Sequence, residues 1–409
     1  MHDVIIIGAG ASGLAAARAM ADAGRHALVV EARDRAGGRI WTDHSHGPVE
    51  LGAEFVHGDR AITWELVHAA GLRLAPWGAD RRFARGGRVL AADDPTIARV
   101  YELYDAVARY EGPDVSVAEL LATRAPAGDP ALAIALRWLA NLEGADPARL
   151  SAAAFGYERA SSTNGEGNFH ILDGYDRLVA HLAAGLDLRL GSPVERVAWG
   201  EAGAAVELAG GETLEARRVL VTLPVGVLKA GRPAFAPALP PAKAAAIAAI
   251  PMGQVTKLAM WFDRRLWPTF TALSTDGQIA TWWPVESAAT PTLMGYQGGP
   301  QAVAVAAMGE ERAIAAGLDD LAALFGPEVR RAFLGGRLAD WSRDPWSCGA
   351  YTYSAVGMGA ARAALAEPVA GTLFFAGEAV AQGGHIATVH GAIESGRRAA
   401  AAILAEAGA

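Results

Sequence analysis

The stretch from 3 to 39 constrains this chain more than any other, because a buried strand, a glycine turn and a helix follow one another within it. Residues 4–7 are an uninterrupted apolar run of the length of one parallel strand. An alanine-rich segment with helix propensity follows over 14–23. Between the two lie three glycines in G-x-G-x-x-G spacing: Gly8, Gly10 and Gly13.

Each glycine has a physical role in such a turn. Gly8 allows the tight turn, Gly10 lets a pyrophosphate approach the backbone, and Gly13 lets the helix pack closely on the strand. The free N–H groups at the helix start attract the diphosphate. Glu31 ends a second strand, predicted over 27–30, and can accept hydrogen bonds from a ribose 2′-hydroxyl. The order of these elements predicts a Rossmann-like unit that binds a dinucleotide.

The segment that follows the acid, EARDRAGGRIWT, distinguishes between dinucleotides. A nicotinamide enzyme does not require a second glycine pair and an arginine here, yet Gly37, Gly38 and Arg39 are present. The segment resembles the E-A-R-x-R-x-G-G-R run of flavin-containing amine oxidases, which lies along the diphosphate and the flavin. The resemblance implies FAD, and a plain NAD dehydrogenase is the disfavoured alternative.

Residues 48–58, PVELGAEFVHG, resemble the E-L-G-A-x-W-x-H-G run that lies beside the flavin ring in the polyamine oxidase branch of this family. Phe55 stands here in place of the tryptophan. His57 stands where that branch has an active-site histidine or acid, and Glu54 or His57 would draw in the cationic amine. A single histidine in a loop bounded by glycines is also compatible with a structural role.

Lys257 lies in a predicted strand, where it shares one face with Val255 and Ala259. A lone lysine among apolar neighbours more often extends its ammonium to solvent. The segment, however, resembles the strand of the family whose lysine holds a water against flavin N5. The resemblance implies that role for Lys257.

Residues 341–353, WSRDPWSCGAYTY, resemble the W-x-x-D-P-x-x-x-G-A-Y motif of the family. The resemblance implies that Trp341 packs at the flavin and that Tyr351 forms a single wall of the substrate channel. Mitochondrial monoamine oxidases carry a cysteine joined covalently to the flavin at the position of Ala350. Cys348 lies two residues earlier, so this register implies non-covalent FAD.

The last stretch, LFFAGEAVAQGGHIATVHGAIESGRRAAAAI, is similar to the closing signature of the family, and its ATVHG run resembles polyamine oxidases and lysine-specific histone demethylases. A helix predicted over 389–405 would point its N-terminus at the N1–C2=O edge of the flavin, where negative charge accumulates on reduction. Together, motif and resemblance place these residues at FAD: Gly8, Gly10, Ala11, Ser12, Gly13, Glu31, Ala32, Arg33, Gly37, Gly38, Arg39, Leu51, Gly52, Ala53, Glu54, Val194, Thr222, Pro224, Trp341, Gly377, Glu378, Thr388 and Val389.

Two domains are expected from 409 residues and the order of the predicted elements. The FAD-binding domain is predicted to be Rossmann-like and discontinuous, from 1–60, 186–245 and 341–409. The substrate-binding domain takes 61–185, which reads as mostly helical, and 246–340, which forms a mixed sheet. The aromatic residues of 261–340 are expected to pack in the core. The fold class is therefore α/β with an α+β substrate domain of amine oxidase type.

Composition excludes several classes of protein. The formal charge of −8 argues against nucleic-acid binding, and no apolar run is long enough to span a membrane. The single cysteine, Cys348, allows no internal disulfide and no thiolate metal site, so no metal is expected. One cysteine and the early first strand, which leaves no room for a signal peptide, suit the cytoplasm. The chain is expected to be a monomer or a homodimer.

The resemblance implies an FAD-dependent amine oxidase near the polyamine oxidase branch. A hydride would pass from the carbon next to the amine nitrogen to flavin N5, the imine would hydrolyse, and O2 would re-oxidise the flavin and yield H2O2. The substrate would be a polyamine or another primary or secondary amine. An L-amino-acid oxidase, a desaturase-type enzyme and a flavin-bound interaction protein with little turnover remain as alternatives. The first is disfavoured because the G-x-M-R run is absent where LGAEF stands.

Overall fold

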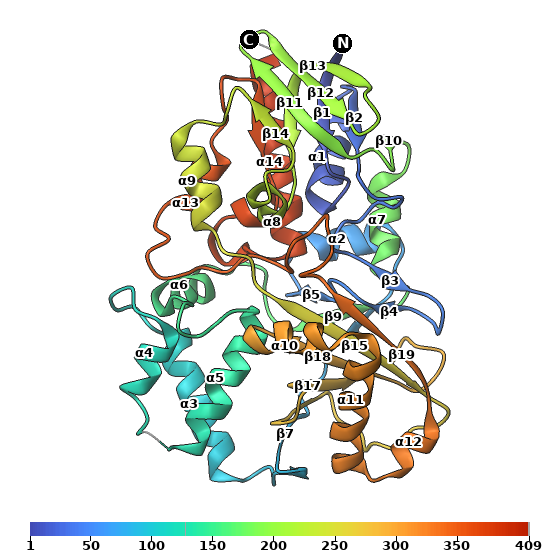
Figure 1. Cartoon of the computed structure of the whole chain (residues 1–409), viewed down its shortest axis with the longest axis vertical. Coiled ribbons are helices and arrows are strands. Elements are labelled where there is room, and N and C mark those ends of the chain that lie inside the picture. The colour runs from blue at the N-terminus through green and yellow to red at the C-terminus, as the bar shows by residue number, and fades with distance from the viewer. Residues whose placement is uncertain (127, 408–409) are drawn as a thin grey trace.

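The computed structural model describes residues 1–126 and 128–407 and is built on two large sheets, one above the other in Figure 1. The upper sheet has eight strands in the order β10-β2-β1-β13-β12-β11-β14, with β20 paired to β13. Parallel pairing joins β10, β2, β1, β13 and β20. This confirms the Rossmann-like α/β fold. The strands are β1 (His2–Ile7), β2 (Ala27–Val30), β10 (Asp187–Arg189), β11 (Val194–Gly200), β12 (Gly203–Leu208), β13 (Thr213–Val221), β14 (Ala234–Ala236) and β20 (Leu373–Phe375).

Two helices from opposite ends of the chain cover one face of this sheet. They are α1 (Ala11–Asp22) and α14 (Val389–Ala407), which pack against each other, and both ends of the chain lie at the top of Figure 1. A Cβ atom on Gly396 of α14 would lie 2.1 Å from the backbone oxygen of Ser12. The two helices therefore approach at backbone distance, which only a small residue allows.

The lower sheet has seven strands in the order β19-β15-β18-β17-β16-β7-β8. All eight residues of β15 are buried, because apolar clusters cover both of its faces. Lys257 falls on the same face as Ala259 and Trp261, as the two-residue period requires. The strands are β7 (Arg81–Arg85), β8 (Arg88–Val89), β15 (Val255–Phe262), β16 (Ala272–Ser274), β17 (Thr281–Pro284), β18 (Thr292–Gly298) and β19 (Phe333–Asp340).

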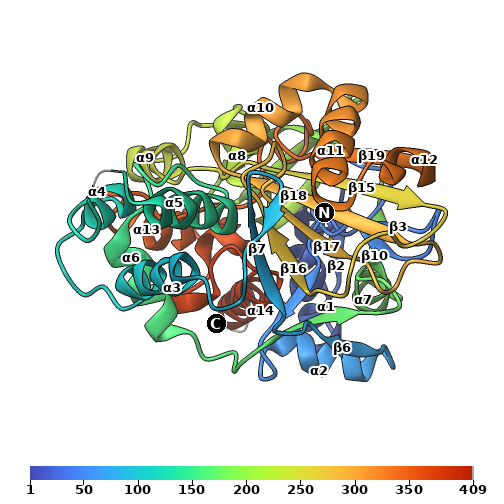
Figure 2. The ribbon, with the colours of Figure 1, turned by 90° about the horizontal axis from the view of Figure 1, so that it is seen from below.

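Two groups of helices flank the lower sheet, as Figure 2 shows from below. One group is α10 (Pro300–Met308), α11 (Glu310–Phe325) and α12 (Glu328–Ala332). The other is α3 (Pro95–Ala108), α4 (Val117–Ala122), α5 (Pro130–Glu143) and α6 (Ala152–Ser161), which share a core of their own. These four helices agree with the prediction that 61–185 is mostly helical.

That prediction is wrong for four strands within 61–185: β6 (Leu74–Pro76), β7, β8 and β9 (Asn168–Ile171). The sequence of β7, RRFAR, has little apolar alternation. Its partner β16 lies about 190 residues away in the chain, so pairing with a distant strand, and not local pattern, makes it a strand.

Smaller elements complete the fold. A short hairpin joins β3 (Thr42–Asp43) to β4 (Val49–Glu50), and β9 lies between β5 (Phe55–His57) and β6. Among the described residues, no helix is long and apolar enough to cross a membrane. The other helices are α2 (Ile62–Ala69), α7 (Asp176–Ala183), α8 (Val225–Lys229), α9 (Pro241–Ala249), α13 (Ala361–Ala366), η1 (Glu378–Val380) and η2 (Gly383–His385).

Candidate functional site

One cavity is lined by most of the residues that the sequence placed at a cofactor, although they come from segments far apart in the chain. Of that set, Gly13, Leu51 and Glu54 lie outside its lining. Lys257, Trp341 and Tyr351 also line the cavity, whereas His57 does not. The predicted cofactor residues on its wall are Gly8, Gly10, Ala11, Ser12, Glu31, Ala32, Arg33, Gly37, Gly38, Arg39, Gly52, Ala53, Val194, Thr222, Pro224, Trp341, Gly377, Glu378, Thr388 and Val389.

The glycine turn between β1 and α1 is shaped by two close approaches. Gly8 has φ +107°, a conformation that favours glycine, and a Cβ atom on Gly13 would lie 2.0 Å from the backbone oxygen of Gly8. Gly13 therefore lets the helix pack against the turn from behind. A Cβ atom on Gly10 would meet none of the described atoms within 4 Å, so Gly10 presents bare backbone to the cavity.

The start of α1 has hydrogen-bond donors to spare. Gly10 at the N-cap has no side chain to accept from the first N–H groups. Ser12 is 4% exposed and lines the cavity, and its Oγ has no hydrogen-bond partner among the described residues. Unpaired donors at the positive end of a helix are suited to an anion such as a diphosphate. The site thus fits the cofactor that the motif implies.

Glu31, at the end of β2, is held by two backbone donors. Its Oε2 accepts from the N–H of Ala9 at 2.8 Å and its Oε1 from the N–H of Arg33 at 2.9 Å. The Arg33 side chain pairs with Asp344 and donates to Ser347 Oγ at 3.0 Å. Asp344 is the acid of the W-x-x-D-P motif, to which no role was assigned, and Ser347 was not singled out; both hold Arg33 from a segment about 310 residues away.

Arg39 connects the first part of the chain to the last, so it is not a solvated loop arginine. One of its terminal nitrogens donates to Glu378 Oε1 at 2.9 Å and to the carbonyl of Ala350 at 2.6 Å. The second oxygen of Glu378 accepts from Thr352 Oγ1 at 2.7 Å. This network brings the GGR segment, the tyrosine segment and the closing strand to one wall.

Lys257 is anchored by the loop that carries LGAEF. Its Nζ donates to Glu54 Oε2 at 2.6 Å and to the carbonyl of Glu50 at 2.9 Å, and the lysine is 4% exposed. Glu54 Oε1 accepts from Trp283 Nε1 at 2.8 Å and lies 3.5 Å from His170 Nδ1. The Glu54 carboxylate is thus directed to Lys257 and Trp283. An ammonium has three N–H donors, so one remains for the cavity that Lys257 lines.

Glu50 is a second buried acid beside this lysine, and the sequence analysis assigned no role to it. Burial raises the pKa of its carboxyl from 4.5 to about 8. Hydrogen bonds from the N–H of Tyr175 at 2.7 Å and from Thr42 Oγ1 at 2.8 Å lower the pKa, but by less than burial raises it. Its carboxyl is therefore largely protonated at neutral pH. The only signal in the sequence is a charged residue inside an otherwise apolar run.

Two tyrosines form a pair at the Lys257 end of the cavity. The hydroxyls of Tyr351 and Tyr296 lie 2.7 Å apart, and Tyr351 donates to the carbonyl of Leu142 at 3.0 Å. Burial raises the pKa of both phenols above 10, so both are neutral. Tyr296, which was expected to be core packing, packs against two apolar clusters and also lines the cavity. The role of Tyr351 as a single wall of the substrate channel stays a prediction. Tyr296 lies directly opposite Lys257 across the β15–β18 ladder, and antiparallel pairing is the signal that could have found it.

Trp341 and Cys348 both belong to the segment 341–353, but only Trp341 lines the cavity. The Nε1 of Trp341 donates to the carbonyl of Leu51 at 2.9 Å; the Leu51 side chain is buried in an apolar cluster outside the lining. Ala350 lines the cavity as well. Cys348 lies outside the lining, with its Sγ 3.9 Å from an Arg232 nitrogen.

His57 is exposed and lies apart from the lysine and tyrosine group. Its Nδ1 is 2.7 Å from Asn168 Oδ1, and its ring centre is 6.5 Å from that of His390. Burial lowers the pKa of His390 to about 3, so that ring is neutral. The role of His57 as a substrate contact stays a prediction. Among the described residues, no group of three His, Cys, Asp or Glu side chains is placed to hold a metal ion.

Comparisons with known proteins agree with this geometry. A family model described as flavin containing amine oxidoreductase matches residues 11–125 and 119–404. The chain belongs to this family. The flavin-containing amine oxidoreductases therefore supply the expected cofactor, a flavin, and the expected reaction class, oxidation of an amine.

Several relatives of this amine oxidoreductase match over nearly its whole length. Polyamine oxidase 4 of Oryza sativa subsp. japonica is 31% identical over 436 residues, covering 97% of this chain and 87% of that protein. Lysine-specific histone demethylase 2 of Homo sapiens is 29% identical, and the matched region covers 98% of this chain and 53% of that protein. Among solved structures, cyclohexylamine oxidase from Brevibacterium oxydans IH-35A superposes with a TM-score of 0.85 at 27% identity, with both chains covered fully. Putrescine oxidase bound to putrescine superposes with a TM-score of 0.85 at 25% identity, covering 99% of each chain.

Proposed function

We propose that this amine oxidoreductase is an oxidase that holds FAD without a covalent bond, oxidises a primary or secondary amine and passes the electrons to O2. The observation that carries the proposal is the position of Lys257. It lines the same cavity as the glycine turn and is held there by Glu54 and by the carbonyl of Glu50. The family relationship supports the amine and the flavin.

Non-covalent binding is supported by the chemistry of the cavity wall. Ala350 lines the cavity, while the thiol of Cys348 lies outside it. The start of α1 and Ser12 would hold the diphosphate, Glu31 the ribose, and Arg39 with Glu378 the middle of the cofactor. When bound, FAD supplies the hydride acceptor for the carbon next to the amine nitrogen.

The residues of the chain position the reaction partners. Lys257 keeps one N–H for a water molecule at the cavity, because its other two are bound to Glu54 and Glu50. The ion pair with Glu54 keeps the ammonium in place where it is almost fully buried. The neutral hydroxyls of Tyr296 and Tyr351 border the space for the amine and present no charge to an unprotonated nitrogen.

Polyamines and diamines are the first substrates to test, since the relatives include a polyamine oxidase and a putrescine oxidase. The experiment is a peroxide-coupled screen of spermine, spermidine, N-acetylated polyamines, putrescine, aromatic monoamines and amino acids with FAD-loaded protein. Peroxide release with an amine supports the oxidase. Release with amino acids alone would favour an L-amino-acid oxidase, and flavin reduction without peroxide would point to another electron acceptor.

Absence of flavin reduction by every compound would favour an interaction protein with little turnover. Acid precipitation tests the cofactor linkage in the same preparation: FAD should remain in the supernatant. Flavin that stays with the precipitated protein would contradict non-covalent binding.

A further inference from the structure

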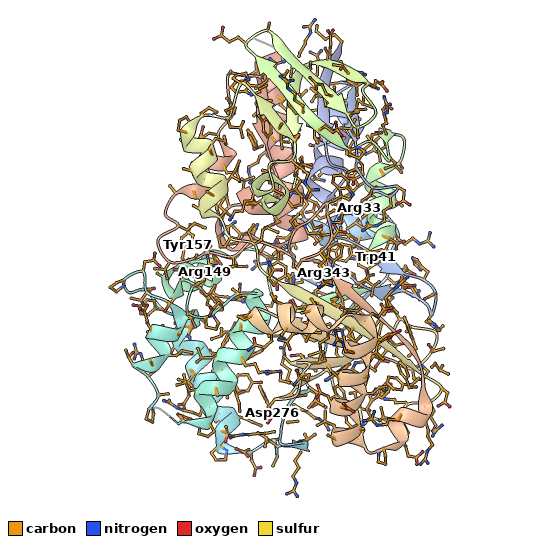
Figure 3. The ribbon with its side chains drawn as sticks, viewed as in Figure 1. Arg33, Trp41, Arg149, Tyr157, Asp276 and Arg343 are labelled. Carbon is orange, nitrogen blue, oxygen red and sulfur yellow. The ribbon has the colours of Figure 1, made fainter. Side chains whose placement is uncertain are left out.

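A second cavity, lined by other residues than the first, lies between α5 and the lower sheet. Its volume is about 610 Å³, within the range of sites that bind small organic molecules. It lies between α5, β7 and the β16–β17 hairpin, and Figure 3 shows Asp276 of this region in the lower part of the molecule, far from Arg33. Its wall includes Phe83, Arg85, Ala133, Ile134, Arg137, Trp138, Asn141, Asp146, Asp276 and Thr281.

The polar groups of this wall leave donors unused. Arg137 donates to the carbonyl of Gly277, but its Nε is buried without a hydrogen-bond partner, and its guanidinium forms no ion pair among the described residues. Burial lowers the pKa of Arg137 despite the nearby charges of Asp320 and Asp276. Arg85 lies on the same wall and is exposed to solvent. Arg137 is therefore the partly buried cation of this wall that has a donor without a partner.

The acids of the same wall are already occupied by backbone donors. Asp276 accepts from the N–H of Gly86 at 3.2 and 3.0 Å through its two oxygens, and Asp146 Oδ1 accepts from the N–H of Ala148 at 2.9 Å. Asp320, which lies close by, accepts from the N–H of Ile279 at 2.8 Å. The wall therefore has a hydrogen-bond donor without an acceptor. A carboxylate ligand supplies such an acceptor, because it can form two parallel hydrogen bonds with an arginine.

The rest of the wall is apolar and partly aromatic. Phe83 and Trp138 meet edge to face, with ring centres 6.1 Å apart, and Ile134 lies on the same wall. We propose that this second cavity binds a small organic anion with an apolar body. The carboxylate pairs with Arg137, and an aryl or aliphatic group packs against Ile134 and Trp138. This goes beyond oxidation of the amine, which takes place in the first cavity.

The wall between the two cavities offers a route by which a bound anion affects the amine site. Asn141 lines the second cavity, donates to Thr281 Oγ1 at 3.1 Å and accepts from the N–H of Gly298 at 2.6 Å. Thr281 is paired with Tyr296 in the β17–β18 ladder. The next residue of α5 after Asn141, Leu142, accepts the hydrogen bond of Tyr351. A ligand that shifts Asn141 therefore shifts supports of both tyrosines.

Calorimetric titration of FAD-loaded protein with 3-phenylpropionate tests the site directly, with 3-phenylpropionamide as the uncharged analogue of the same shape. The carboxylate should bind at least about tenfold more tightly than the amide, equivalent to about 1.4 kcal/mol. Arg137→Gln should remove that preference. Arg109→Gln, a change at an exposed arginine directly after α3, should retain it.

Ala133→Phe supplies a second variant that fills the cavity without touching its charges, and it should abolish binding of both compounds. Equal binding of carboxylate and amide, or unchanged affinity in Arg137→Gln, would overturn the recognition of an anion. Absence of binding heat with both compounds in the wild type, or full binding in Ala133→Phe, would overturn the site itself. These measurements need no turnover, so their outcome is separate from that of the proposed oxidase activity.

The coupling is tested by amine kinetics with and without 3-phenylpropionate. We expect the carboxylate to change the KM for the amine at least about twofold in the wild type and to leave the KM of Ala133→Phe at the value that this variant has without the carboxylate. A change of KM that persists in Ala133→Phe would place the effect in the first cavity and overturn the coupling. An unchanged KM in wild type that binds the carboxylate would overturn it as well.

Discussion

At the end of the first cavity that holds Gly8, Gly10 and Glu31, recognition relies on backbone: bare N–H groups, a turn and an acid fixed by two amides. At the opposite end, Lys257, Tyr296 and Tyr351 present side chains whose positions depend on hydrogen bonds to other segments. At the first end, the turn, the start of α1 and Glu31 come from one short segment, and Asp344 and Ser347 are added from a distant one. The second end needs partners as far as 209 residues apart. The difference predicts that mutations at the two ends fail in different ways.

The largest effect is expected at the side-chain end, from Lys257→Met. Methionine leaves the Glu54 carboxylate buried without its cation, and such a change costs about 3–5 kcal/mol of unfolding free energy. Turnover of the amine should fall at least about tenfold, which corresponds to ~1.4 kcal/mol of barrier. Chemical denaturation and rapid-mixing flavin kinetics measure the two effects.

The double variant Lys257→Met/Glu54→Gln separates them. It should recover most of the lost stability, because no buried charge remains, while turnover stays slow. Wild-type rates of flavin reduction and re-oxidation in either variant would contradict the role given to Lys257.

Glu50 makes the same end of the cavity sensitive to pH. Its pKa is raised from 4.5 to about 8, so the folded protein holds a proton that the unfolded chain releases above pH 4.5. The contribution of Glu50 to the free energy of unfolding is therefore complete below pH 4.5 and is lost as the pH rises through about 8. Between these two values the free energy of unfolding falls by up to about 1.4 kcal/mol per pH unit. Glu50→Gln, which cannot ionise, should lack this component. Unfolding measured across this window should show the stability of the wild type falling relative to the variant; parallel profiles would refute a buried neutral acid.

Two alanine variants test the backbone end. Gly13→Ala places a Cβ atom 2.0 Å from the Gly8 oxygen, so it should destabilise even the flavin-free protein, by about 1–3 kcal/mol. Gly10→Ala meets no described atom within 4 Å and should leave the flavin-free protein as stable as the wild type while weakening flavin retention. Thermal unfolding with and without FAD measures the stability of each variant, and gel filtration measures how much flavin each one retains. If the two variants behave alike, the division of roles between the glycines is wrong.

The smallest effect is expected from Tyr296→Phe. It removes the hydrogen bond between the two hydroxyls, while Tyr351 keeps its bond to the carbonyl of Leu142. We expect a loss of about 0.5–1.5 kcal/mol of stability and a rise in KM with little change in kcat. Tyr157→Phe, at a tyrosine that is 64% exposed, is the control. A large fall in kcat would mean that Tyr296 does more than border the amine.

Local pattern was enough to predict the strand, glycine turn and helix of the upper sheet, because period, turn chemistry and propensity agree there. Resemblance added Arg39, Lys257 and Trp341, which the structure brings to one cavity. Pattern failed for β7, whose arginine-rich sequence becomes a strand through pairing with β16. It also missed Tyr296, Trp283 and Glu50, because a buried aromatic or acid looks the same in sequence whether it packs in a core or borders a ligand.

The bond between Arg39 and Glu378 and the packing of α1 on α14 also bear on the order of events during synthesis. A ribosome releases the Gly8 turn first, and the segments that complete its surroundings emerge last. The nascent βαβ unit must therefore wait, with apolar surface uncovered, for nearly the whole remaining chain. We expect flavin capture to be a late step after translation, and a chain shortened before α14 to be a substrate for chaperones and proteases instead of a weaker enzyme.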